Sequence, residues 1–102
     1  MKYLVQILLP LADNSGKQFP DELLRGIHTE LAEKFGGLTA HSRAPAKGVW
    51  RSGAEKQTDD IVIVEVMADA LDENWWAAFR ARLERLLRQE KMVVRAQAIQ
   101  EL

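Results

Sequence analysis

The chain of 102 residues contains no cysteine, only three prolines and six glycines. Without cysteine, the chain cannot form disulfides, iron–sulfur clusters or thiolate metal sites, and the composition fits a reducing cytoplasm. No apolar run approaches the roughly 20 residues that a membrane span needs, so we expect no membrane partner. The formal net charge is only −1, so the chain as a whole does not attract nucleic acid or anionic lipid.

The remaining composition is that of an ordinary globular protein, with 47% apolar and 28% charged residues. A chain of this length buries about two-thirds of its unfolded surface, which suits one hydrophobic core. We therefore expect residues 1–102 to form a single domain.

A strand, a helix and a second strand can be read along the first half of the chain. Residues 2–9 are apolar and compatible with a β-strand. They also resemble a short signal peptide, but Gln6 within the run and Pro10 at its end favour the strand. Pro20 and the two acids after it are typical of a helix start, and Gly36-Gly37 of a helix end. A half-buried strand is predicted over 38–43, interrupted by Pro45 and Gly48.

In the second half, Val49-Trp50 can resume that strand before a turn near Ser52-Gly53. Residues 60–67 are rich in β-branched side chains and predict the clearest strand. Either Asp69 or Asp72 is expected to cap a second helix. Its apolar face is predicted from Trp75 or Trp76, Phe79, Leu83, Leu86 and Leu87. Residues 92–99 form the last predicted strand.

The predicted order is strand, helix, strand, strand, helix, strand. This order resembles the ferredoxin-like α/β-plait superfamily, an α+β fold with two layers. Right-handed crossovers then give an antiparallel four-stranded sheet in the order 4-1-3-2, counting strands along the chain, with both helices on one face. The resemblance extends to element order only, and this fold carries many unrelated functions.

Several functions that this fold carries elsewhere lack their residues here. RNA-binding plaits stack bases on aromatic residues of the two middle strands, where this chain offers only Tyr3, so no nucleic-acid partner is expected. His28 and His41 are the only histidines, too few for a catalytic zinc site, so we expect neither metal nor cofactor. The loop 13–17 lacks the full phosphate-loop motif and is interpreted as a solvated turn. Arg80 and Arg88 are interpreted as surface partners of Glu84.

Strand alternation assigns one sheet face to the helices and leaves the other open. The open face mixes an apolar field with polar side chains. The apolar residues are Leu4, Leu8, Ile61, Ile63, Met67, Val93 and Ile99, and the polar ones are Gln6, Thr39, His41, Arg43, Glu65, Arg95 and Gln97. Such an apolar field is too large to remain exposed on a monomer. We therefore expect a homodimer that packs sheet to sheet.

Two functional hypotheses follow from this face. The first is a non-catalytic dimeric protein that binds a small molecule or a protein partner. The second is a cofactor-independent monooxygenase or isomerase of the dimeric α+β barrel class. In that case His41 and Glu65 are the candidate catalytic residues. Candidate ligand-binding residues are Gln6, Arg43, Arg95 and Gln97. We expect Glu65 to form a charge cluster with Arg43 and Arg95, with Gln6 lying between Glu65 and Arg95.

Overall fold

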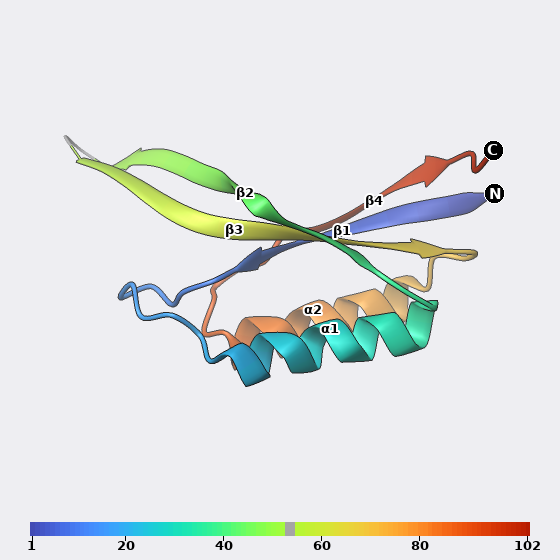
Figure 1. Cartoon of the computed structure of the whole chain (residues 1–102), viewed down its shortest axis with the longest axis horizontal. Coiled ribbons are helices and arrows are strands. Elements are labelled where there is room, and N and C mark those ends of the chain that lie inside the picture. Colours follow the sequence, from blue (N-terminus) through green and yellow to red (C-terminus); the bar gives the residue numbers. More distant parts are fainter. Residues whose placement is uncertain (53–54) are drawn as a thin grey trace.

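The computed structural model describes the backbone of residues 1–52 and 55–102, and the side chains of residues 1–41 and 61–102. Its elements are β1 (Lys2–Pro10), α1 (Asp21–Phe35), β2 (Thr39–Ser52), β3 (Glu55–Ala68), α2 (Glu73–Leu86) and β4 (Val94–Ile99). The strands form one antiparallel sheet in the order β2-β3-β1-β4. Both helices lie against one face of this sheet, and the other face is open (Figure 1). The predicted fold class and strand order are confirmed.

The core lies between the two central strands and the helices. Alternate residues of β1 and β3 point toward the helices because side chains of a strand alternate between faces. The core cluster takes Val5, Ile7, Leu9, Val62, Val64 and Val66 from the two strands, and Ile27, Leu31, Trp76, Phe79, Leu83 and Leu87 from α1, α2 and the C-cap of α2. Burying each of these larger side chains contributes about 1.5–3 kcal/mol. The face assignment predicted for β1 and β3 is therefore confirmed.

The helix ends follow local rules. Pro20 occupies the N-cap of α1, and Gly36 ends the helix with φ 77°, donating its amide to the carbonyl of Ala32. This left-handed conformation favours glycine because it has no Cβ. Asp72 caps α2, since its carboxylate accepts the amide of Trp75 at 3.0 Å. The alternative cap, Asp69, lies outside the helix.

Helix α2 differs from the prediction at its C-terminal end. The sequence predicts Leu86 on the apolar face, but its side chain is 47% exposed. Leu87, the C-cap residue, is fully buried instead. The prediction is wrong because adjacent helical residues point about 100° apart, so Leu86 and Leu87 cannot both face the core.

The two tryptophans of α2 are buried to different extents, as predicted. Trp76 is buried at 7% exposure, whereas Trp75 is half-buried. Phe35 stacks on Trp76 with ring centroids 5.2 Å apart, and Trp75 stacks on Phe79 at 4.9 Å. These aromatic contacts link the end of α1 to the first turns of α2.

The β2–β3 hairpin is longer than the sequence predicted. Strand β2 begins at Thr39 and continues to Ser52, and β3 begins at Glu55 rather than near Asp60. The expected interruption exists as a register shift between His41 and Ala46. Because β2 is an edge strand, it tolerates proline in this stretch. The hairpin projects beyond the helices at one end of the molecule (Figure 1).

Strand β4 is shorter than predicted and begins at Val94, not Met92. Met92 is buried in the preceding loop, where its amide donates to the Glu84 carboxylate at 2.9 Å. Ala96 and Ala98 alternate with the open-face residues of β4 and so face the helix side, where both are exposed. The helices therefore leave this edge of the sheet uncovered. No helix among the described residues is long and apolar enough to cross a membrane.

Candidate functional site

A polar row crosses the open sheet face between two rows that are mostly apolar. Cross-strand pairing aligns Thr39 with Glu65, Glu65 with Gln6, and Gln6 with Arg95. The same register places Leu8 opposite Ile63 on one side of this row. On the other side it places Leu4 opposite both Met67 and Gln97. We call Thr39, Glu65, Gln6, Arg95 and the adjacent His41 the polar stripe.

Hydrogen bonds connect four members of the polar stripe into a chain. The Nε of Arg95 donates to the Oε1 of Gln6 at 2.8 Å. The Nε2 of Gln6 donates to the Oε2 of Glu65 at 2.6 Å, and the Oε1 of Glu65 lies 2.8 Å from the Nε2 of His41. Gln6 lies between Arg95 and Glu65, as the sequence predicted. The amide can bridge them because it carries both a donor and an acceptor.

The Glu65 carboxylate lies at the centre of the stripe, and its side chain is only 19% exposed. Hydrogen bonds from His41 and Gln6 stabilise its charged form and lower the pKa of Glu65, despite the opposing effect of partial burial. Glu65 is therefore an anion at neutral pH, held between apolar rows of the sheet.

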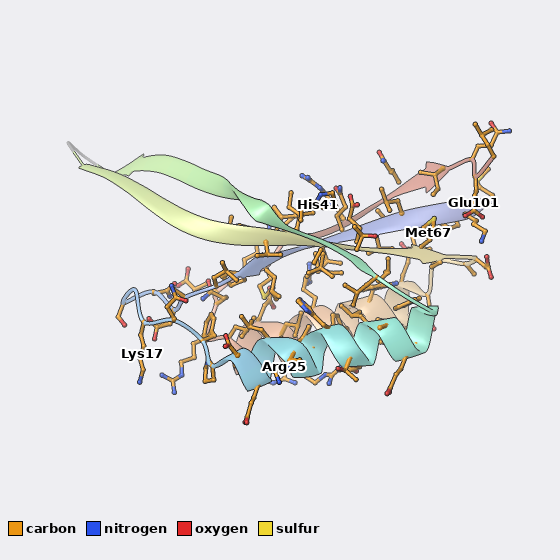
Figure 2. All side chains as sticks on the ribbon, viewed as in Figure 1. Lys17, Arg25, His41, Met67 and Glu101 are labelled. Carbon is orange, nitrogen blue, oxygen red and sulfur yellow. The ribbon has the colours of Figure 1, made fainter. Side chains whose placement is uncertain are left out.

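His41 projects from β2 on the side of the sheet opposite the helices (Figure 2). Its side chain is 52% exposed. When the ring is neutral, donation from Nε2 to Glu65 leaves Nδ1 with a free lone pair. The pair thus presents an imidazole that is oriented by a carboxylate and open to the surroundings.

Two hollows lie next to the polar stripe, and Leu4 lines both of them. One, of about 260 Å³, is lined by Leu4, Gln6, Arg95, Ala96 and Gln97. The other, of about 380 Å³, contains Glu65, Met67 and the Gly36-Gly37 turn. Three of the predicted ligand-binding residues, Gln6, Arg95 and Gln97, therefore share one hollow, and Glu65 lines the other.

The predicted charge cluster is only partly represented in the described residues. The residue paired with Glu65 on β2 is Thr39, and Arg43 follows in the stretch of shifted register. The side chain of Arg43 lies outside the described residues. His41 occupies the place beside Glu65 that we expected for Arg43. Alternation already puts His41 on this face, and a diagonal neighbour is within reach of a long side chain.

The two histidines lie on opposite sides of the sheet. His28 belongs to α1, where its Nε2 is buried without a hydrogen-bond partner within the described residues, and burial lowers its pKa. No group of three or more His, Cys, Asp or Glu side chains that could hold a metal occurs in the described part of the chain.

Solved structures of similar fold were found, whereas no family model and no curated protein matches the sequence. The divalent cation tolerance protein (Cut A1) of Thermus thermophilus is 17% identical with a TM-score of 0.60. The match covers 99% of this chain and 86% of that one. A phage SAM lyase in complex with S-methyl-5′-thioadenosine is 15% identical with a TM-score of 0.60, covering 94% and 80%. At these identities the likeness shows the fold alone.

Proposed function

We propose that this protein is a small homodimeric binding protein that self-associates through its open sheet face and binds a small carboxylate at the Arg95 end of the polar stripe. The observation that carries the proposal is the hydrogen-bonded row of polar side chains within an apolar field. The proposal includes the cytoplasmic location inferred from the sequence.

The self-association part is supported by the exposure of apolar side chains on the open face. Met67 is 46% exposed and Val93 is 43% exposed. Leu4, Leu8, Ile61, Ile63 and Ile99 are half-buried. A contiguous apolar surface of this kind is typical of a protein–protein contact. An isologous dimer covers the same surface on both copies.

The ligand-binding part is supported by the free hydrogen-bonding capacity of Arg95. Its Nε is bonded to Gln6, while no acceptor within the described residues contacts its two terminal nitrogens. Together they present a planar pair of donors that matches a carboxylate. The Gln97 amide lines the same hollow and can donate to the same ligand. Leu4 provides an apolar wall for the ligand body.

Mass in solution tests the self-association. We expect sedimentation to give a dimer at tens of micromolar, and Ile63→Lys to yield a monomer. The substitution puts an unpaired charge into an apolar contact, which costs several kcal/mol. Leu86→Lys is the matched control, because Leu86 is an exposed apolar residue of α2. A wild-type monomer, or a dimer that Ile63→Lys leaves unchanged, contradicts the proposal.

Titration with acetate and with its uncharged analogue acetamide tests the ligand site. We expect acetate to shift the side-chain amide signals of Gln6 and Gln97 in NMR spectra, and acetamide to have no effect. Arg95→Gln should weaken acetate binding about tenfold, in line with loss of a charge-assisted hydrogen bond. Arg85→Gln, on the exposed side of α2, is the control. Equal binding of both probes contradicts a carboxylate site.

A second candidate function rests on the contact between His41 and Glu65. An imidazole oriented by a carboxylate is the arrangement of a general base, and would suit a cofactor-independent isomerase or monooxygenase of the dimeric α+β barrel class. One of the similar structures is a lyase, so catalysis occurs on this architecture elsewhere. Glu65→Ala tests whether this contact is available for catalysis. Loss of the dimer assigns Glu65 to the interface between copies, whereas an intact dimer leaves the contact of His41 with Glu65 free to act on a ligand.

A further inference from the structure

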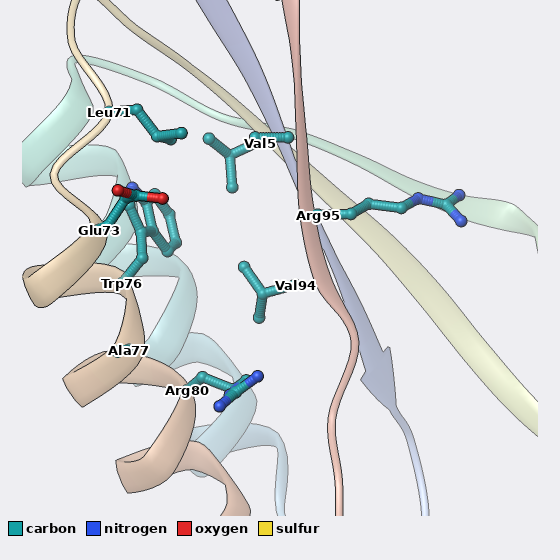
Figure 3. Close-up of a pocket in the computed structure, with 9 residues that line it drawn as sticks. Val5, Leu71, Glu73, Trp76, Ala77, Arg80, Val94 and Arg95 are labelled. Carbon is teal, nitrogen blue, oxygen red and sulfur yellow. The ribbon is translucent and has the colours of Figure 1, made fainter.

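A cleft lies on the helix side of the sheet, between α2 and β4 (Figure 3). Its volume is about 380 Å³, within the range of small-ligand sites. Val5 and Val94 point into it from the sheet, and Leu71 and Trp76 face them from the other side. Arg95 belongs to this cleft through its backbone, because its side chain points away to the open face.

The cleft exists because β4 presents small side chains to a helix that does not cover them. Ala96 lines the cleft, and Ala77 of α2 lies across from it. Both alanines are exposed, as is Ala98. Larger side chains at these positions would fill the space between helix and strand. The indole of Trp76, stacked on Phe35 from within the core, forms one wall of the opening.

Two opposite charges lie along the rim of this cleft. Glu73 and Arg80 belong to α2 and are seven residues apart, which places their Cα atoms about 10 Å apart along the helix. Neither makes an ion pair within the described residues. Glu84, which the sequence suggested as a partner of Arg80, accepts the Met92 amide instead. Both rim charges are therefore available to a ligand.

The third component of the site is the free edge of β4. This strand pairs with β1 on one side and with no other strand among the described residues. In an antiparallel ladder, every second residue of an edge strand directs its amide and carbonyl outward. Such an edge accepts an extended peptide as an additional strand.

The direction of β4 and the two rim charges indicate the same orientation for such a peptide. A short loop connects the end of α2 to the start of β4, so helix and strand run in opposite directions. A strand added antiparallel to β4 therefore runs parallel to α2. Its N-terminus lies at the Glu73 end and its C-terminus at the Arg80 end. The free ammonium thus meets a carboxylate, and the free carboxylate meets a guanidinium.

We infer that the cleft between α2 and β4 binds a short extended peptide of about three residues with free termini. Three extended residues span about 10 Å, which matches the spacing of the rim charges. The peptide backbone pairs with β4, and its central apolar side chain occupies the hollow beside Trp76. This site is separate from the polar stripe, which lies on the opposite face of the sheet.

Calorimetry with the tripeptide Ala-Leu-Ala, free and with both termini capped, tests the inference on the full chain. We expect saturable binding of the free peptide with a Kd of about 1 mM or tighter, and a shift of the Trp76 indole N–H signal in NMR spectra. Capping should abolish the binding. Equal binding of both forms overturns the inference. So does a failure of the free peptide to saturate the protein at concentrations above about 1 mM.

Three variants locate the peptide. Ala77→Leu fills the hollow from an exposed helical position, so the fold should persist while free-peptide binding is lost. Glu73→Gln and Arg80→Gln should each weaken binding roughly fivefold, as for exposed ion pairs. Arg85→Gln is the control for Arg80→Gln. Unchanged affinity in Ala77→Leu overturns the inference, and so does a change of oligomeric state in that variant, because the cleft would then hold a second copy.

Discussion

At the scale of single residues, Glu65 shows how a charge is accommodated on an otherwise apolar sheet face. Both carboxylate oxygens accept hydrogen bonds, one from Gln6 and one from His41. Polar groups removed from water are costly unless they are paired. The same two contacts that satisfy Glu65 also make its ionisation part of the folding equilibrium.

We predict that Glu65 makes stability depend on pH in the acid range. Its pKa is lowered in the folded protein, so the unfolded chain binds more protons there. The contribution to stability is present above the unfolded pKa of about 4.3. It is lost as pH falls through the lower folded pKa. Urea unfolding of Glu65→Gln should show a shallower loss between about pH 5 and 3 than the wild type.

Glu33→Gln is the control for this measurement, because Glu33 is exposed on α1. It should retain the wild-type slope. If Glu65→Gln and the wild type lose stability in parallel, the carboxylate is not stabilised by the stripe in solution.

At the scale of elements, α2 combines a local start signal with a long-range packing role. Asp72 satisfies one of the free amides of the first turn by accepting a hydrogen bond from Trp75. Asp69 lies before the helix and instead approaches Lys2 at 3.5 Å, with 90% of its side chain exposed. Exposed ion pairs of this kind contribute little. Asp72 therefore contributes more to the stability of the folded chain than Asp69, although the two acids lie only three residues apart.

Substitution of the two acids tests this difference. Asp72→Ala should lower the free energy of unfolding by about 1 kcal/mol, the usual effect of losing an N-cap. Asp69→Ala should change it by less than about 0.5 kcal/mol. Chemical denaturation followed by far-UV circular dichroism measures both. Equal losses from the two variants would show that the cap hydrogen bond does not stabilise α2.

The aromatic side chains of α2 provide a second prediction at this scale. Trp76→Ala removes a ring that stacks on Phe35 and is 7% exposed. We expect a loss of about 3–5 kcal/mol, as for other large core truncations. Trp75→Ala is the matched variant and should cost clearly less, because part of that ring already contacts solvent. A comparable loss from both variants would contradict the packing described above.

At the scale of the whole molecule, the two faces of the sheet carry different sites. On the helix side, the β4 edge of the sheet is left uncovered, and the cleft lies there. The open face carries the polar stripe and the apolar field. A single copy therefore leaves two surfaces available, one that we assign to a second copy and one that we assign to a peptide.

Self-association should make thermal stability depend on protein concentration. A partner that binds only the folded chain stabilises it by mass action. We expect the wild-type melting temperature to rise between about 1 and 100 µM protein, and that of Ile63→Lys to stay constant. Scanning calorimetry at several concentrations measures this. A wild-type melting temperature independent of concentration would argue against a dimer in this range.

The element order, the start and end of α1, and the faces of β1 and β3 could be predicted from the sequence alone. These features depend on local chemistry and on periodicity, as with Pro20 before α1 and the alternation of valines in β3. From them the strand order followed, and Gln6 could be placed between Glu65 and Arg95. The greater burial of Trp76 over Trp75 also followed, because adjacent helical residues point in different directions.

The residue that pairs with Glu65 could be known only from the folded chain, because the pairing depends on the register of β2, which shifts between His41 and Ala46. Pro45 and Gly48 predict an interruption but not the resulting register. The same holds for the choice between Asp69 and Asp72 as the cap, and for which leucine at the end of α2 is buried. The cleft between α2 and β4 had no sequence signal at all. A cleft arises where a helix fails to cover a strand, and that depends on the packing of segments far apart in the chain.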